Sequence, residues 1–255
     1  MSAGFPLSAA GFIQATYDAK NRPLPEQPAV VLSLLRRIWR LLRRQILIAV
    51  TAIGCLIFVV NWVNPPITYY IWQEQKRLGN MDFSWVDFDE ISPVMARSAV
   101  AAEDANFCLH WGFDMAAIRT AIDDGGNRGA STLTQQTVKN IFLWPARSWS
   151  RKALEALLTP VVEIMWSKQR ILEIYLNIAE FDIGVFGVEA AALHYFGVQP
   201  KNLSPVQAAH LAAVLPSPKT RSASNPTSFV RARATAIADG AATIVKDGRS
   251  ACFDD

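Results

Sequence analysis

The chain has 255 residues, of which 51% are hydrophobic and 18% are charged, and its formal net charge is +3. This composition excludes an intrinsically disordered, collagen-like or low-complexity chain, and three cysteines exclude a small disulfide-stapled protein. The charge is too small to indicate nucleic-acid binding, whereas a mean hydropathy of +0.16 is high for a soluble protein and favours a membrane segment.

An uncharged apolar run over residues 46–63 predicts one transmembrane helix. At about 1.5 Å per residue it covers roughly 27 Å, close to the thickness of the hydrocarbon core. Pro65 and Pro66 then stop the helix. A cleaved signal peptide is the alternative, but the run begins about 45 residues into the chain and no small-residue cleavage site follows.

Charges on either side of the run predict its orientation. Only Lys76 and Arg77 follow it closely, whereas five arginines precede it: Arg36, Arg37, Arg40, Arg43 and Arg44. Because cytoplasmic flanks carry the excess of Lys and Arg, we expect a cytoplasmic N-terminus and a large C-terminal part outside. Cys108 and Cys252 lie in that outer part, where an oxidising compartment permits pairing, but two free thiols fit the sequence equally well.

The rest of the chain divides by composition and periodicity. Residues 1–45 are expected to form a cytoplasmic tail with a basic flank, mobile over residues 1–30, and residues 64–90 a juxtamembrane stalk. Residues 91–255 read as one mainly α-helical domain. Its helix signals are Ser92-Pro93, a capping box from Ser204 to Gln207, and a helical period over 151–180 with a kink at Pro160.

The first stretch that could carry chemistry begins with two adjacent carboxylates, Glu103 and Asp104, which close an apolar helix. Aromatic residues and His110 follow. A carboxyl group among apolar neighbours has a raised pKa, and a base that removes a proton from a sugar hydroxyl needs such a shift. The alternative is a solvated helix end next to a packed core histidine.

Two further stretches supply hydrogen-bond donors and cations. Residues 129–140 form a small-residue turn that opens a helix rich in hydroxyl, amide and ammonium groups, which suits phosphate or polyhydroxyl ligands but also an ordinary helix start. Residues 147–152 hold three cations after the bulky apolar run 141–144, which is typical of a surface that touches anionic lipid. A fourth stretch, 168–177, is predicted to form an amphipathic helix whose role is mainly structural.

In this order and spacing, the stretches resemble the peptidoglycan glycosyltransferases (glycosyltransferase family 51), in particular its monofunctional members. The resemblance runs from about Val94 to Pro218. It rests on Glu-Asp-x-x-Phe-x-x-His-x-Gly, Gly-Ala-Ser-Thr-x-Thr-Gln-Gln-x-x-Lys-Asn, Arg-Lys-x-x-Glu, Ile-Leu-x-x-Tyr-Leu-Asn, and Gly-Val-Glu-Ala-Ala running into Tyr-Phe-Gly.

The resemblance implies a lysozyme-like α-helical domain with a hydrophobic flap against the bilayer. Its reaction would polymerise lipid II into β-1,4-linked glycan strands, with inversion and release of undecaprenyl diphosphate. Glu103 would be the general base, and Glu155 would assist at the diphosphate, directly or through a divalent metal (Mg or Mn). No organic cofactor is expected. The substrate-binding residues would be Asp104, Ser131, Thr132, Gln136, Lys139, Asn140, Arg147, Arg151 and Lys152.

The resemblance also implies surroundings and partners. The domain would be periplasmic, held at the cell inner membrane by a single span. Its partners would be lipid II, the growing glycan strand, inner-membrane lipids and other cell-wall synthesis or division proteins, without nucleic acid. The chain leaves no room for a transpeptidase domain, so no transpeptidase activity is expected.

Some residues depart from the family pattern. Asp182 stands where relatives usually have Gly, and a loop that needs positive φ there would be strained. The last ~30 residues carry no recognisable motif. Two alternatives remain: a membrane-anchored muramidase or lytic transglycosylase, which centres on one acidic Glu and has no use for the cation cluster, and a non-enzymatic cell-wall scaffold, which needs no special Glu103.

Overall fold

A computed structural model describes residues 28–125 and 129–254, so the predicted mobile tail lies almost entirely outside the described residues. The chain forms two compact units, residues 1–55 and 56–255. Each is described by itself.

Helix α2, Pro28–Trp62, is 35 residues long and begins well before the predicted start at residue 46. The extension follows because residues 29–45 contain Leu, Arg and Ile but no Pro or Gly to interrupt a helix. The helix ends before Pro65 and Pro66, as predicted. Its segment Val31–Trp62 contains an 18-residue window with a mean hydropathy of 2.1 and is long and apolar enough to cross a membrane, which is compatible with a single-pass anchor.

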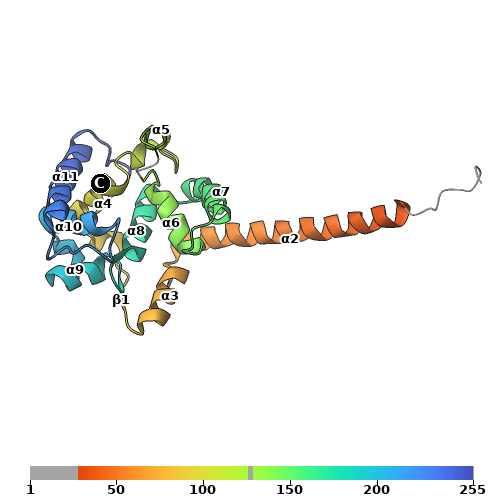
Figure 1. The fold of residues 1–255 in the computed structure, drawn as a ribbon, viewed down its shortest axis with the longest axis horizontal. Coiled ribbons are helices and arrows are strands. Elements are labelled where there is room, and N and C mark those ends of the chain that lie inside the picture. The colour runs from red at the N-terminus through yellow and green to blue at the C-terminus, as the bar shows by residue number, and fades with distance from the viewer. Residues whose placement is uncertain (1–27, 126–128, 255) are drawn as a thin grey trace, which may run out of the picture. The chain divides into compact units, whose positions relative to one another are not determined.

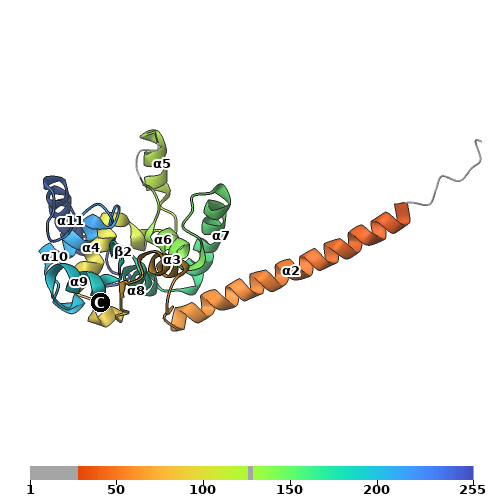
Figure 2. The ribbon, with the colours of Figure 1, turned by 60° about the horizontal axis from the view of Figure 1, so that its bottom comes forward.

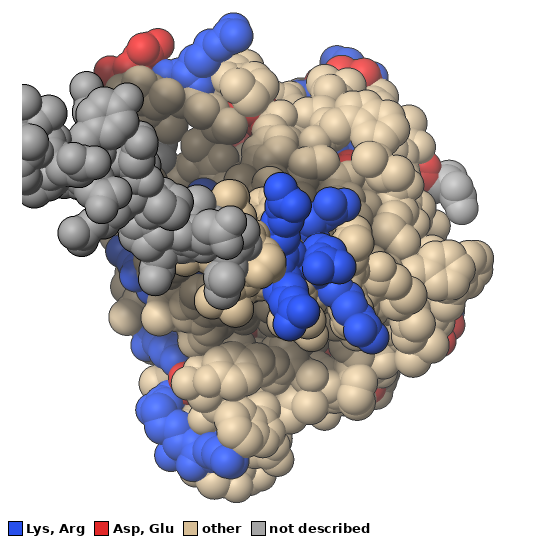
Figure 3. Space-filling model, turned by 90° about the vertical axis from the view of Figure 1, so that its right-hand side faces the viewer, with Lys and Arg blue, Asp and Glu red and all other residues tan. Residues whose placement is uncertain are grey.

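The basic residues of α2 lie on one face of the helix. At 3.6 residues per turn, Arg36, Arg37, Arg40, Arg43 and Arg44 fall within an arc of roughly 120°. No acidic residue occurs in α2. Figure 3 shows a group of Lys and Arg side chains with no acidic side chain among them.

The second unit is mainly helical, with two groups of packed helices. Helices α4, α10 and α11 pack on one another, and α6 packs on α7 and α8; Figures 1 and 2 show both groups. Its elements in chain order are α3 (Tyr69–Leu78), β1 (Asp82–Phe83), η1 (Phe88–Glu90), α4 (Pro93–Glu103), η2 (Phe107–Leu109), α5 (Met115–Asp123), α6 (Leu133–Phe142), α7 (Trp149–Met165), α8 (Lys168–Ile178), β2 (Glu180–Asp182), β3 (Val185–Phe186), α9 (Val188–Phe196), η3 (Pro200–Asn202), α10 (Pro205–Val214) and α11 (Ser228–Lys246).

A small sheet shows that residues 64–90 are not a separate stalk. The strand order is β1-β3-β2, with β1 parallel and β2 antiparallel to β3. Strand β1 comes from the predicted stalk, and Ile71 of α3 is fully buried in the core of the domain. The expectation of a stalk is therefore corrected: burial of Ile71 and strand pairing of Asp82 and Phe83 build this segment into the domain.

The helix starts agree with the sequence signals in most places. Ser204 and Gln207 form the predicted capping box of α10. Pro93 stands at the start of α4, but the Ser92 hydroxyl donates to the Leu203 carbonyl at 3.2 Å instead of capping the helix. The helical stretch over 151–180 is two helices, because Trp166 is buried between them and Ser167 caps α8. Pro160 lies inside α7.

Asp182 is not strained. It lies in β2, where its carboxylate accepts hydrogen bonds from the Ile183 amide at 2.7 Å and the Tyr195 hydroxyl at 2.7 Å. The positive φ of this turn, 76°, belongs to Gly184, and no non-glycine residue in the described ranges has a positive φ.

A disulfide closes the domain. Cys108, in η2 just after the Glu103 stretch, is bonded to Cys252 near the C-terminus. The two thiols that the sequence left open are therefore paired, and they join segments 144 residues apart.

Candidate active site

Glu103 is the last residue of α4, and its side chain is only 12% exposed. Its Oε2 accepts a hydrogen bond from the Gln136 amide at 3.0 Å. The guanidinium of Arg233 lies 3.8 Å from its Oε1. Burial raises the pKa of Glu103, whereas Gln136 and Arg233 act in the opposite direction. The expected perturbed carboxyl group is thus present, and it is not a solvated helix end.

Asp104 uses both of its carboxylate oxygens inside the protein. Oδ1 lies 2.8 Å from Nε2 of His110, and Oδ2 accepts from the Leu133 amide at 3.0 Å. The aspartate therefore fixes the first turn of α6 next to the end of α4. This buried geometry gives Asp104 a positioning role, and its expected substrate contact stays a prediction.

Thr132 also positions α6. It is buried, caps the helix in a capping box with Gln135, and donates from its hydroxyl to the Gly112 carbonyl at 2.7 Å. Its polar atoms are occupied in the same way as those of Asp104. Ser131, one residue earlier, is exposed and has its hydroxyl 3.5 Å from the ammonium of Lys152.

Glu155 is the centre of a cation cluster on α7. Its side chain is 4% exposed, its Oε2 accepts from Arg151 at 2.8 Å, and its Oε1 is paired with Lys152. Arg151 also donates to the Ala146 carbonyl at 2.9 Å, which fixes the loop before α7. The Arg151–Glu155 ion pair is buried at the glutamate and is not a surface ion pair.

Two more cations lie on this side of the site. Lys139 of α6 is under the electrostatic influence of Glu155, Arg151, Lys152 and Glu103, and burial lowers its pKa. Arg147 is exposed and has no ion pair within the described ranges. Glu155 alone cannot balance these four cations, so the cluster can attract an anionic ligand.

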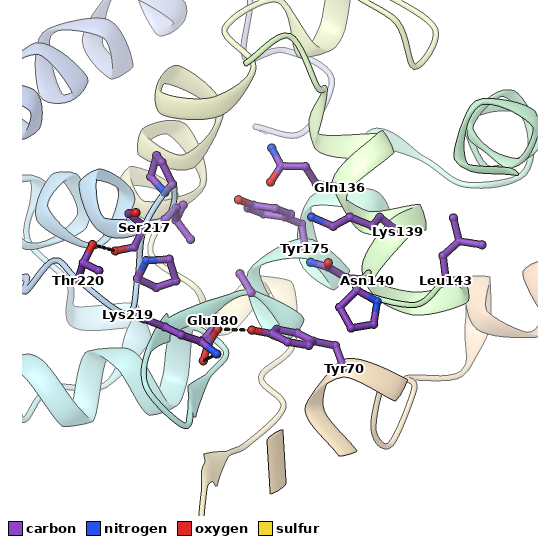
Figure 4. Close-up of a pocket in the computed structure, with 15 residues that line it drawn as sticks. Tyr70, Gln136, Lys139, Asn140, Leu143, Tyr175, Glu180, Ser217, Lys219 and Thr220 are labelled. Carbon is purple, nitrogen blue, oxygen red and sulfur yellow. Dashed lines mark hydrogen bonds and ion pairs between the residues drawn. The ribbon is translucent and has the colours of Figure 1, made fainter. Parts of the chain in front are cut away.

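Two cavities lie close to Glu103. One, of about 430 Å³, is lined by Gln136, Lys139, Asn140 and Tyr175, with residues 215–220 on its opposite wall (Figure 4). The other, of about 290 Å³, is lined by Glu103 and Asp104 together with residues 129–132. Gln136, on the wall of the larger cavity, donates to Glu103, on the wall of the smaller one.

Sequence reasoning missed the arginines that approach Glu103 from the C-terminal region. Arg233 of α11 packs against the end of α4, and Arg221 precedes α11 and donates to the Ala213 carbonyl at 2.9 Å. The charges of both lower the pKa of Glu103. No local pattern could have shown this, because only the packing of α11 on α4 brings residues 130 positions apart together.

The described residues do not form a complete protein site for a divalent metal. They contain no group of three His, Cys, Asp or Glu side chains that could hold one, and both oxygens of Glu155 are engaged by Arg151 and Lys152. The metal at Glu155 stays a prediction, and we derive no step through it.

Comparison with known proteins decides the family. A profile described as transglycosylase matches residues 73–242. The chain belongs to the transglycosylase family. A biosynthetic peptidoglycan transglycosylase of Jannaschia sp. (strain CCS1) is 55% identical over 225 residues, which cover 87% of this chain and 94% of that protein.

Two Pseudomonas proteins with the same name are similar over somewhat less of the chain. The protein of Pseudomonas fluorescens (strain SBW25) is 48% identical over 76% of this chain and 85% of its own length. That of Pseudomonas putida KT2440 is 46% identical over 79% of this chain and 89% of its own length. The family match extends beyond the motif region on both sides and includes most of α3 and α11.

Proposed function

We propose that this transglycosylase polymerises lipid II into β-1,4-linked peptidoglycan strands and releases undecaprenyl diphosphate. The observation that carries the proposal is the position of Glu103, a buried carboxyl group on the wall of one cavity, hydrogen-bonded to Gln136 of a second cavity that Lys139 also lines. The name shared by the relatives, biosynthetic peptidoglycan transglycosylase, agrees with this assignment.

Glu103 acts as the general base. The acceptor 4-hydroxyl must lose its proton as it attacks the anomeric carbon of the growing strand, and one carboxylate within hydrogen-bond reach is sufficient. Gln136 orients this carboxylate by donating to Oε2, which leaves Oε1 free of hydrogen bonds from the described residues. Because burial raises the pKa of Glu103, it becomes a stronger base than an exposed glutamate.

The cations stabilise the departing diphosphate. A diphosphate leaves readily when its developing charge is met, so Lys139, Arg147, Arg151 and Lys152 take the place of the acid that a glycosidase uses. Glu155 holds two of these side chains in fixed positions. Attack opposite the leaving group inverts the anomeric centre and converts an α-linked diphosphate into a β-glycoside. No covalent sugar–enzyme intermediate is required.

The cation cluster favours synthesis over the two alternatives. A membrane-anchored muramidase cleaves a neutral glycosidic bond and gains nothing from a basic cluster next to its acid. A scaffold does not need a buried carboxyl group on the wall of a cavity, such as that of Glu103. We therefore retain cleavage and scaffolding only as outcomes of the experiment below.

The same proposal places the domain in the periplasm, with α2 anchoring it in the inner membrane. The five arginines of α2 support a cytoplasmic N-terminus, and the disulfide between Cys108 and Cys252 fits an oxidising compartment outside it. Lipid II would then reach the site from the outer leaflet.

A gel of reaction products tests the proposal. Purified full-length protein in detergent is incubated with labelled lipid II, and we expect long glycan strands. Glu103→Gln should reduce strand formation by at least 10²-fold while lipid II binding stays within about threefold, because the lost group is a base. Glu90→Gln is the matched control, since Glu90 is exposed and paired only with Lys201. In a parallel incubation with purified sacculi, shortened fragments would indicate cleavage. No product in either incubation would indicate a scaffold.

A further inference from the structure

The larger cavity contains a second polar cluster, away from Glu103. It consists of Tyr70 from α3, Glu180 from β2 and Lys219 from the loop before α11, and Figure 4 shows it across the cavity from Gln136. The Tyr70 hydroxyl donates to Glu180 Oε2 at 2.6 Å. The Lys219 ammonium lies 3.5 Å from Glu180 Oε1. The mechanism above uses none of these residues.

Glu180 has an acceptor that the described residues leave unused. Its side chain is 6% exposed, and Oε1 is buried without a hydrogen bond from any of them. The Lys219 ammonium forms an ion pair with both Glu180 Oε1, at 3.5 Å, and Glu74, at 3.1 Å. Buried carboxylate oxygens usually accept a hydrogen bond, so an oxygen that lacks one at a cavity wall, beside an ammonium, is suited to a ligand that donates to it.

The geometry points to a sugar-hydroxyl subsite: we propose that Glu180 and Lys219 together bind one hydroxyl of the acceptor substrate. A hydroxyl both donates and accepts, so it can donate to the carboxylate oxygen and accept from the ammonium beside it. A phosphate offers only acceptors and would be repelled by Glu180 and Glu74. The inference rests on the proposed function and adds where the acceptor sugar is held.

The position of the cluster fits an acceptor whose reacting hydroxyl is at Glu103. Gln136, which contacts Glu103, lines the same cavity as Glu180, so one bound disaccharide can contact both. Tyr70 fixes Glu180 from one side, and a turn in which the Thr220 hydroxyl donates to the Ser217 carbonyl at 3.2 Å holds Lys219 on the other. Both groups that would bind the hydroxyl are therefore held in place by the protein.

Glu180→Ala and Glu180→Gln test the subsite in full-length protein with lipid II. We expect Glu180→Ala to raise KM for lipid II about tenfold or more, with kcat within threefold, because a charged hydrogen bond is lost in both ground and transition states. Glu180→Gln keeps an oxygen acceptor and should lose less. Glu90→Gln is the matched control: Glu90 is an exposed glutamate paired with Lys201 and does not line the cavity, so KM should stay within twofold.

Lipid II analogues lacking one sugar hydroxyl each distinguish binding from a structural role. With the wild type, one analogue should show about tenfold weaker binding than lipid II, and with Glu180→Ala that analogue and lipid II should bind equally. If Glu180→Ala has the wild-type KM, or if it weakens all analogues equally, the subsite does not exist. Polymerisation by the wild type in the same assay keeps the proposed function separate from this result.

Discussion

At the scale of single residues, Glu103 is placed where its charge is unfavourable to the fold. Burial raises its pKa, and the nearby charge of Arg233, 3.8 Å away, compensates only in part. A group whose pKa is higher in the folded than in the unfolded state stabilises the protein below its unfolded pKa. It loses that contribution as the pH rises through the folded pKa. The burial of Glu103 therefore makes the protein less stable at neutral pH than it would be with an unshifted carboxyl group.

Glu103→Gln should consequently raise the melting temperature at pH 7 while it abolishes polymerisation. Glutamine keeps the shape of the protonated acid without its charge, and each unit of pKa shift corresponds to about 1.4 kcal/mol. Below about pH 4, where the carboxyl group is protonated in both states, the two proteins should melt alike. Thermal unfolding of both between pH 3.5 and 8 measures this. If the variant melts at a lower temperature than the wild type at pH 7, the claim that the buried charge of Glu103 reduces stability is wrong.

At the scale of elements, the ends of α4 and α6 form the site, and α7 and α11 close it from two sides. The capping boxes and the Glu103 stretch could be predicted because their signals lie within a few residues of each other. The packing of residues 64–90 into the domain could not be predicted, since β1 is recognisable only through its pairing with β3. The positions of Arg233 and Glu180 near the site could not be predicted either, because the residues that surround them come from distant segments of the chain. Asp104 and Thr132 make positioning contacts within the protein that the sequence did not indicate, and their predicted ligand contacts stay predictions.

The C-terminal segment is held against the catalytic stretch by several contacts. Beside the Cys108–Cys252 disulfide, Arg97 forms two hydrogen bonds to Asp254, at 2.6 and 2.8 Å. We expect Cys252→Ser to lower the free energy of unfolding by about 2–5 kcal/mol, because the disulfide closes a long loop. Denaturant unfolding measures this, with Cys55→Ser as the control, since Cys55 is unpaired and exposed. Wild-type unfolding that is unaffected by a reductant would contradict the expectation.

At the scale of the whole molecule, orientation in the membrane decides whether the site can meet its substrate. The arginines on one face of α2 favour the cytoplasmic side, and a disulfide forms readily only on the other. We expect alkaline phosphatase fused after the last residue to be active, and a fluorescent reporter that folds only in the cytoplasm to be dark at the same position. Replacing the five arginines with Gln should reduce phosphatase activity, because the orienting charge is then lost. An active cytoplasmic reporter on the unmodified chain would contradict this orientation. The cation cluster around Glu155 would then lie in the cytoplasm, away from the outer leaflet.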